Sequence, residues 1–490
     1  MQSQNRFLKP FLLAGWSCIA MIAIWQIHAR VGSPIAALTA AALLLVSLGF
    51  SRYVLGLPFT TGPMLYLALL GLFHLGLVVP WALGLYNVNR VPWFASYGLS
   101  RSLALVTYSI LAYQLGLLAA LRGRTPSDGL PIEGSANLEN SKMFVAGNFI
   151  FVFGVSMFVL GLIQLDPTGY YKLTYTDTFR LRAESDPRFF GTGMIFASIG
   201  LCMSVAGASQ QRIRFTLLYT GLWVSVLFYL GFRGPALIAC LIVYTLALKK
   251  GTEFPRWFPW LALVFLVIAV PIMGVVRDEP LGNRSFDSAI NFLDAPAEMG
   301  QSIRPLIETE ALVGPRDYRY GKTYLSALKA IIPNLALRWE APNAESVEDL
   351  PPSHWIIAVV EPWVYKNYGG MGFSAIAEPY MNFGSAGVVA YFLLLAFALV
   401  RLEQVAIRNS YALATWGLIL GPLLWTVRND FTTFFRPAAW GLLCLGIVRL
   451  SSGSFVLFSR AWRRGNTKSR LREMSAATFG STGKFRREHQ

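Results

Sequence analysis

Charged residues are scarce in this sequence of 490 residues. Asp, Glu, Lys and Arg make up 14% of it, whereas hydrophobic residues make up 54%. Charged residues account for about a quarter of a typical water-soluble globular domain. Such a domain would not carry this many apolar runs of membrane-spanning length. The composition therefore predicts a protein that crosses a membrane several times.

Cysteine is also rare. The chain has four cysteines, and all of them fall inside apolar runs: Cys18, Cys202, Cys240 and Cys444. Cysteine in such surroundings behaves as a small hydrophobic residue, so we expect neither a disulfide framework nor a cysteine metal site. The first apolar run lacks a small-residue cleavage site after it, which predicts that it stays as a membrane anchor.

Acidic residues are the scarcer charge, with 26 Asp and Glu against 42 Lys and Arg and a net charge of +16. A nucleic-acid partner would be one explanation of this excess. However, Lys and Arg gather in short connections on alternate sides of the apolar runs and in the C-terminal tail. Because this is the pattern of the positive-inside rule, the excess indicates orientation in a membrane and gives no reason to expect a nucleic-acid partner.

The apolar runs predict an all-α polytopic membrane protein with about 12 transmembrane helices. An even number of spans puts both termini on one side. The positively charged connections make that side the cytoplasm. The runs lie at 10–28, 34–50, 63–85, 99–121, 144–164, 192–209, 214–231, 234–248, 257–276, 374–400, 409–426 and 437–458.

Polar segments divide the chain into parts. Residues 1–276 form a transmembrane bundle of about nine spans, with an outer loop at 165–191. Residues 277–372 form a large extracytoplasmic loop with short surface helices, 373–458 hold the last three spans, and 459–490 are a basic cytoplasmic tail. A loop of roughly a hundred residues is too long to be only a connection and is typical of a binding or catalytic element.

Several arginines lie on the predicted outer side, against the positive-inside bias. A guanidinium binds phosphate oxygens bidentately, so an anionic ligand would account for them. In Gly231-Phe-Arg-Gly-Pro235 the glycines and the proline break a helix, which predicts a hairpin with Arg233 at its tip. For Arg233, the alternative to ligand binding is a side chain that snorkels to the interface. In 165–191, Tyr170, Tyr171 and Tyr175 with Arg180 and Arg182 either bind sugar and phosphate or form an interfacial aromatic belt with solvated charges.

Four stretches, taken in order, resemble the Wzy-type polymerases of lipid-linked polysaccharide repeat units, such as O-antigen and enterobacterial common antigen polymerases. They are the Gly-Phe-Arg-Gly turn at 231–234, Ile-Pro-Asn…Arg-Trp at 332–339, the return into apolar sequence at 372–387, and Arg-Asn-Asp-Phe-Thr-Thr-Phe-Phe-Arg at 428–436. Together with the large outer loop before the last three spans, they extend the resemblance over 180–440.

The resemblance implies a fold similar to the GT-C class and a glycosyltransferase on the outer face of the bacterial inner membrane. Such an enzyme transfers a growing glycan from its undecaprenyl diphosphate to the non-reducing end of a new lipid-linked unit. The resemblance implies no cofactor and no metal, and the predicted outer loops contain no Asp-X-Asp motif. Membrane lipids, a chain-length regulator and a flippase are the further partners that it implies.

The implied chemistry needs cations and a proton acceptor. Without a metal, arginines would meet the charge that develops on the leaving diphosphate. Arg233, Arg428 and Arg436 are the first candidates. Arg180, Arg182 and Arg277 come next. Candidates for the proton acceptor are His354, Glu361, Glu378 and Asp430.

Glu378 begins an apolar span, where an unpaired carboxylate is costly and is usually functional or paired. It is therefore a catalytic base or the partner of an arginine. His354 is the only histidine of the predicted outer loops, and a structural role is its alternative. Tyr380 and Asn382 either bind sugar hydroxyls or pack between helices.

Other functions remain open. An O-antigen ligase shares the large outer loop but uses lipid A core as the acceptor, and the loop histidine favours it. A flippase would be a transporter, yet the charges lie in loops and the two halves show no repeated layout. A scaffold subunit of a polysaccharide export complex is a further alternative, but it would not need so many arginines on its outer face.

Overall fold

The computed structural model describes residues 2–29, 33–87, 92–95, 98–122, 140–165, 188–255, 257, 272, 293–332, 347–368 and 372–451. These residues form helices and connections, with no strand among them. The predicted all-α polytopic membrane protein is confirmed. The chain consists of two compact units, Met1–Leu442 and Leu443–Gln490.

In the described part of the chain, seven helices are long and apolar enough to cross a membrane. They cover Pro10–Ile27, Ser33–Tyr53, Leu99–Leu121, Ser141–Gln164, Phe189–Gly207, Ala377–Ala406 and Thr432–Ser451, and two shorter apolar helices cover Gly62–Leu75 and Ser410–Trp425. The predicted runs at 214–231 and 234–248 are also helical. The run at 257–276 lies almost wholly outside the described residues, so the count of about 12 spans stays a prediction.

The elements of the unit Met1–Leu442 follow one another along the chain. They are α1 (Gln2–Ala29), α2 (Ser33–Tyr53), α3 (Gly62–Leu75), α4 (Val78–Ala82), η2 (Pro92–Ala95), α5 (Leu99–Leu121), α6 (Ser141–Leu165), α8 (Arg188–Gly207), α9 (Gln210–Tyr229), α10 (Arg233–Lys249), α12 (Asp294–Met299), η6 (Gly300–Ser302), α13 (Ile303–Leu312), α14 (Lys322–Lys329), η7 (Val347–Asp349), α15 (Pro352–Val360), α16 (Pro362–Tyr368), α17 (Ala377–Ala406) and α18 (Ser410–Trp425).

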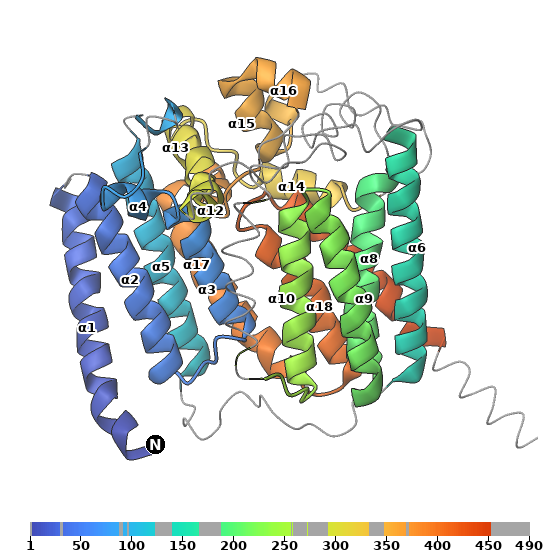
Figure 1. Cartoon of the computed structure of the whole chain (residues 1–490). Coiled ribbons are helices and arrows are strands. Elements are labelled where there is room, and N and C mark those ends of the chain that lie inside the picture. The colour runs from blue at the N-terminus through green and yellow to red at the C-terminus, as the bar shows by residue number, and fades with distance from the viewer. Residues whose placement is uncertain are drawn as a thin grey trace, which may run out of the picture. The chain divides into compact units, whose positions relative to one another are not determined.

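The short helices α12 to α16 gather at one end of the long helices (Figure 1). We call this end the loop face. The N-terminus of α1 lies at the opposite end (Figure 1). The turn between α9 and α10, with Gly231 at a φ of 92°, forms the predicted hairpin at the loop face. Only glycine adopts such a φ without strain.

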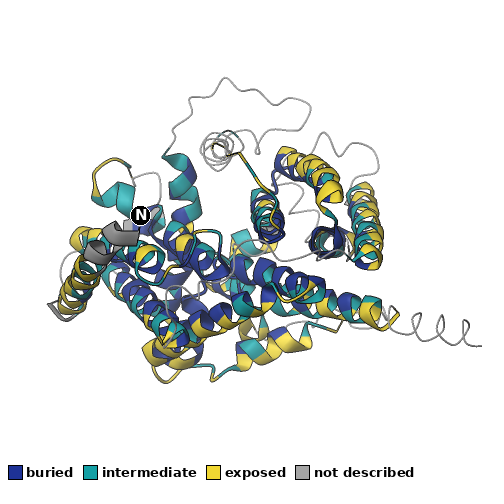
Figure 2. Cartoon of the chain, turned by 90° about the horizontal axis from the view of Figure 1, so that it is seen from below, coloured by how far each residue is buried: buried dark blue, intermediate teal, exposed yellow. Residues whose placement is uncertain are grey.

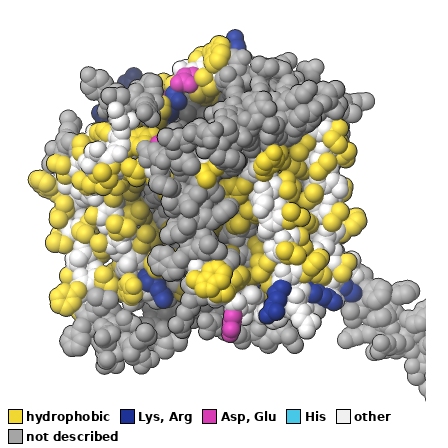
Figure 3. Space-filling view, in the orientation of Figure 1, with side chains coloured by type: hydrophobic (Ala, Val, Ile, Leu, Met, Phe, Trp, Pro, Cys, Tyr) yellow, Lys and Arg dark blue, Asp and Glu magenta, His cyan; other side chains and the backbone are white. Residues whose placement is uncertain are grey.

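Apolar side chains cover the outside of the helices. Phe149, Leu218 and Leu222 are largely exposed although they are hydrophobic. Figure 2 shows exposed positions along the outward sides of the helices and buried positions where helices face one another. Figure 3 shows a hydrophobic band with Lys and Arg side chains at its lower edge. This is the surface that a hydrocarbon environment requires.

Helices α6 and α8 pack with their backbones in direct contact. Two rows of glycines, each repeating every seventh residue, face each other: Gly147, Gly154 and Gly161 on α6, and Gly193, Gly200 and Gly207 on α8. A Cβ atom on Gly154 would overlap the backbone of Ala197, and one on Gly193 would overlap Phe158. Small residues allow this close approach, which stabilises helix pairs in membranes.

Gly154→Leu should therefore destabilise the α6–α8 pair by about 1–3 kcal/mol or more, because the new side chain must push the helices apart. Thermal unfolding of the purified protein in detergent measures the loss. Gly221→Leu on α9 is the matched control, since nothing lies within 4 Å of a Cβ there. Equal melting temperatures for the two variants would contradict the packing.

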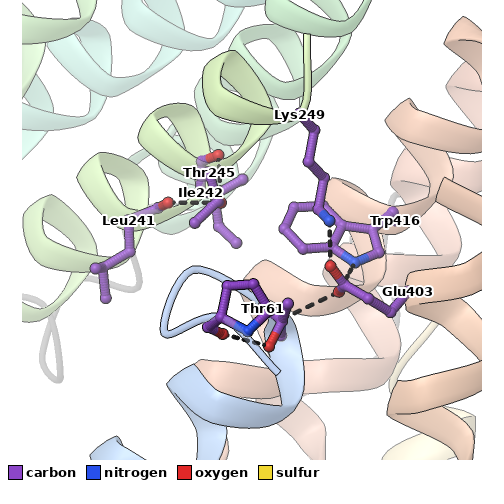
Figure 4. Close-up of polar contacts among 9 residues, drawn as sticks. Thr61, Leu241, Ile242, Thr245, Lys249, Glu403 and Trp416 are labelled. Atoms are coloured by element: carbon purple, nitrogen blue, oxygen red, sulfur yellow. Dashed lines mark hydrogen bonds and ion pairs between the residues drawn. The ribbon is translucent and has the colours of Figure 1, made fainter. Parts of the chain in front are cut away.

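A buried ion pair joins three long helices at the end away from the loop face (Figure 4). The Lys249 ammonium of α10 donates to Glu403 of α17, and their side chains are 7% and 1% exposed. The second carboxylate oxygen of Glu403 accepts from Trp416 Nε1 at 2.8 Å and from the Gly62 N–H at 3.1 Å. The ammonium also lies 4.8 Å from the centre of the Trp416 ring. Such a pair is tolerated in an apolar bundle because its hydrogen bonds are satisfied.

Removing one member of this pair should cost more than neutralising both. Lys249→Met leaves a buried, uncompensated carboxylate, which costs about 3–5 kcal/mol. Glu403→Gln, added to Lys249→Met, removes that charge and keeps an acceptor for Trp416 and Gly62. The double variant should melt above the single variant in detergent, and the reverse order would show that the pair carries no buried charge.

Candidate functional site

The first turn of α17 places the Glu378 carboxylate inside the protein, with 1% of the residue exposed. Ser374 begins this turn, and its hydroxyl oxygen accepts from the N–H groups of Ile376 and Ala377 at 3.1 and 3.3 Å. The same hydroxyl lies 2.7 Å from Nε2 of His74, whose Nδ1 lies 2.9 Å from the Leu70 carbonyl. Because a carbonyl only accepts, Nδ1 is the donor, and the Ser374 hydroxyl donates to Nε2.

Two donors hold the Glu378 carboxylate. The Thr323 hydroxyl donates to Oε1 at 2.8 Å, and the Phe431 N–H donates to Oε2 at 2.9 Å. Among the described residues, no Lys or Arg forms an ion pair with it. Glu378 is therefore a buried hydrogen-bond acceptor, and the alternative of an arginine partner does not describe its contacts here.

One turn further along α17, Asn382 fixes the large loop to the helix. Its side-chain oxygen accepts from the Gly321 N–H at 2.8 Å, and its amide nitrogen donates to Thr323 Oγ1 at 2.7 Å. The backbone N–H groups of Arg319 and Tyr320 donate to the carbonyls of Met381 and Asn382. A chain of donors thus runs from Asn382 through Thr323 to Glu378.

A kink in α17 exposes the carbonyls that receive the loop. Phe383 and Gly384 have non-helical dihedral angles, and Gly384 combines a φ of 64° with a ψ of −157°. Residues with a Cβ atom are strained in this region. A Cβ on Gly384 would also overlap the Tyr318 hydroxyl. Glycine is therefore required for the loop to dock.

Asp430 is the second buried carboxylate of the site. Its Oδ1 accepts from the N–H and the hydroxyl of Thr432. Asp430 thereby caps the start of the helix Thr432–Ser451. Its Oδ2 accepts from the Ser353 N–H at 3.0 Å, in the first turn of α15. Glu378 accepts from the residue that follows Asp430, so the two carboxylates are electrostatic neighbours.

Aromatic side chains pack around Phe431, whose backbone N–H donates to Glu378. The rings of Tyr324 and Tyr391 meet the Phe431 ring edge-on, with centroids 5.1 and 5.7 Å away. Burial, and to a smaller degree Glu378, raise the pKa of Tyr324 well above its ordinary value. The Tyr324 hydroxyl therefore keeps its proton.

Arg233 and Arg436, two of the predicted arginines, have protein partners. Arg233 forms a two-point ion pair with Glu298 of α12, in which Nη1 lies 2.8 Å from Oε2. Arg436 donates from Nε to the Ala330 carbonyl at 2.7 Å, and Trp440 donates to Ile331 at 2.9 Å, so both hold the end of α14. Positive groups at a helix C-terminus complement its dipole.

Arg428 lies in the connection between α18 and the last helix, and its carbonyl accepts from the Phe373 N–H at 2.7 Å. Because the last helix begins at Thr432, Arg428 and Arg436 do not share one helix face. A Cβ on Gly234 would overlap the Trp425 ring, so the 231–234 turn packs on the end of α18. Arg180, Arg182 and Arg277 lie outside the described residues.

The other predicted residues lie around this centre. His354 follows Ser353, the donor to Asp430, and its ring meets Tyr365 edge-on at 5.9 Å. Glu361 forms an ion pair with Arg304 of α13. Tyr380 packs edge-on against Tyr318, with ring centroids 6.2 Å apart. The structure therefore brings Glu378, Asn382 and Asp430 together and places His354 beside them.

Sequence reasoning missed Thr323, Tyr324 and Arg319. Arg319 lies 4.6 Å from the centre of the Trp355 ring and donates to the Glu348 carbonyl at 3.1 Å. Burial lowers the pKa of the Arg319 guanidinium, while Glu348 and Asp349 act in the opposite direction. No local pattern identifies these three residues, since their partners lie far away in the chain. Among the described residues, no group of three His, Cys, Asp or Glu side chains could hold a metal ion.

Long apolar helices, with a polar loop docked on a buried carboxylate, define a multi-pass membrane protein with a polar site at one end. The model of the family "O-antigen polysaccharide polymerase Wzy" matches residues 11–457. The chain therefore belongs to this family, which implies a polymerase-type activity in surface polysaccharide biosynthesis.

The chain is also similar to Protein CapE of Staphylococcus aureus, with 24% identity over 350 residues that cover 68% of this chain and 70% of that protein. No solved structure matches the chain. The resemblance to Wzy-type polymerases, first seen in four short stretches, is thus confirmed over most of the sequence. The GT-C-like arrangement stays a prediction.

Gly384→Ala should release the loop from α17, because alanine is strained at this φ and meets the Tyr318 hydroxyl. Limited proteolysis of the purified protein should then cut within 314–322 faster than in the wild type. Tyr318→Phe, added to Gly384→Ala, removes the nearest of the overlapping atoms and should slow cleavage part of the way back. Unchanged cleavage in Gly384→Ala would show that docking does not need the kink.

Proposed function

We propose that this protein polymerises undecaprenyl-diphosphate-linked oligosaccharide repeat units at its loop face, which is the outer face of the bacterial inner membrane. Both termini then lie in the cytoplasm. Lys and Arg residues at helix ends away from the loop face support this orientation: Arg52, Arg122, Arg212, Arg214, Arg401 and Arg408. The family favours a polymerase over a ligase, a flippase or an export scaffold.

The observation that carries the proposal is the buried Glu378 carboxylate with two neutral donors and no cation. Each carboxylate oxygen has two lone pairs, so Glu378 can take up a proton while it keeps its two hydrogen bonds. An acceptor sugar hydroxyl placed beside it loses its proton to Glu378 as it attacks the anomeric carbon of the donor glycan. Burial makes the ionised state costly, which favours uptake of that proton.

The bond between the anomeric carbon and the lipid diphosphate breaks in the same step. The electron pair leaves with the diphosphate, and arginines would stabilise its charge in place of a metal. Arg233 and Arg428 come from the two stretches that pack together at the end of α18. A diphosphate would compete with Glu298 for the Arg233 guanidinium, because both bind in the same two-point manner.

Asp430 and His354 complete the proposed site. The further candidates for binding the diphosphate are Arg180, Arg182, Arg277 and Arg436. Asp430 fixes the connection that supplies the Phe431 N–H, so it positions Glu378. His354 lies next to this connection and is the second candidate for proton transfer. Asn382 acts through Thr323, whereas Tyr380 lies outside this network and packs against Tyr318.

The test uses a strain that lacks this protein and expresses wild type, Glu378→Gln or Glu253→Gln at equal membrane levels. Glu253 is exposed and lies next to the end of α10 away from the loop face, so Glu253→Gln is the matched control. Gel analysis of surface glycan should show a ladder for wild type and the control, and single repeat units for Glu378→Gln. Loss of a general base slows a reaction roughly 10²–10⁴-fold.

A normal ladder in Glu378→Gln would remove Glu378 from the reaction. Loss of every surface glycan in the strain, single units included, would instead indicate ligation or transport. A second arm compares Arg233→Ala with Glu298→Gln. If Arg233 binds the diphosphate, Glu298→Gln keeps the ladder and Arg233→Ala loses it, whereas equal losses indicate that only the ion pair matters.

A further inference from the structure

A cavity of about 330 Å³ lies between α1, α2, α5, α13 and α17. It is distinct from the Glu378 site, although both involve the first turns of α17. Polar side chains from all five helices line it, including Gln26, Thr39, Arg101, Tyr108, Glu310 and Tyr380. Its volume is in the range of ligand-binding cavities.

An ion pair marks the end of the cavity nearest the loop. Arg101 Nη1 lies 3.1 Å from Glu310 Oε1, and the side chains are 78% and 8% exposed. The carboxylate is thus buried in the lining, and the guanidinium reaches outward. From Arg101 to Tyr108 the lining follows α5 for about 10 Å into the bundle, at 1.5 Å for each residue.

The lining favours a neutral ligand that is rich in hydroxyl groups. Arg101 and Glu310 cancel each other's charge, whereas a phosphate would require an excess of positive charge. A hydrocarbon chain would leave Oε2 of the Glu310 carboxylate and the amide of Gln26 without polar contacts, since Arg101 reaches only Oε1. Tyrosine rings, a carboxylate and an amide offer both apolar faces and hydrogen bonds, as a sugar ring requires.

The cavity lies close to the proposed reaction centre. Tyr380 follows Glu378 by two residues on α17, which places the side chains on nearly opposite sides of the helix. Glu378 faces Thr323 and Phe431, while Tyr380 faces the cavity. Only the width of one helix, about 10 Å, separates the two sites.

We propose that this cavity binds an uncharged sugar residue of the lipid-linked oligosaccharide and positions the chain beside Glu378. The identity of the ligand rests on the proposed function, but the site itself rests on the lining. Glu310 and Tyr380 are then specificity-determining residues that contact sugar hydroxyls. The Arg101–Glu310 pair fixes the carboxylate at the mouth of the cavity.

Binding of sugar to the full-length protein in lipid nanodiscs tests the inference. The probe is the oligosaccharide that mild acid releases from the host's lipid-linked intermediates, and native mass spectrometry reports the bound fraction. Glu310→Gln should weaken binding roughly tenfold, as expected for loss of a charged hydrogen-bond partner. Ala104→Phe should abolish binding, because Ala104 lines the cavity and phenylalanine fills it.

Leu115→Phe is the matched control, since Leu115 lies on α5, is 49% exposed and does not line the cavity. It should bind the sugar as wild type does. Equal binding by wild type, Glu310→Gln and Ala104→Phe would overturn the inference, as would no binding by wild type. Ala104→Phe that loses a co-purified phospholipid but keeps the sugar would also overturn it.

The same samples separate this inference from the proposed function. Glu378→Gln should bind the released sugar normally while making no polymer, because its change affects the reaction and not the cavity. If wild type makes no ladder yet binds sugar in a manner that depends on Glu310, the polymerase proposal fails and the cavity stands. If the ladder is normal and binding is independent of Glu310, only the cavity fails.

Discussion

Helix α17 buries a carboxylate near each of its ends, and segments far apart in the chain meet there to satisfy them. A buried carboxylate must receive hydrogen bonds or a cation, because it has lost the stabilisation of water. Glu403 receives Lys249, Trp416 and the Gly62 N–H. Glu378 receives only neutral donors. Glu403, which is paired with a cation, therefore joins helices and has a structural role. Glu378, which has no cation, can still take up a proton.

The hydrogen bonds at the Glu378 end of α17 also hold the large loop against this helix. The kink at Phe383 and Gly384 frees carbonyl groups, and the segment 319–323 donates to them. Asn382 and Thr323 then extend the same hydrogen bonds to Glu378. Docking of the loop and burial of the carboxylate are therefore one arrangement, and a change in either affects the other.

The family to which the chain belongs gives this arrangement a functional context. Membership of the O-antigen polysaccharide polymerase Wzy family implies a polymerase-type activity in surface polysaccharide biosynthesis. Rigid glycine contacts between α6 and α8 and the ion pair of Lys249 and Glu403 provide a firm scaffold. The contacts of Glu378 lie at the loop face, because its donor Thr323 belongs to α14, one of the short helices gathered there (Figure 1).

The sequence by itself determined the class of fold, because the length and hydropathy of a membrane span are local properties. It also identified Glu378 as costly to bury and the 231–235 segment as a turn, since both follow from neighbouring residues. It could not identify Thr323, Tyr324 or the Arg233–Glu298 pair. Thr323 and Phe431 lie more than fifty residues from Glu378 on either side. Only tertiary packing brings such donors to one carboxylate, and only it decides that the opposite side of α17, with Tyr380, lines a cavity.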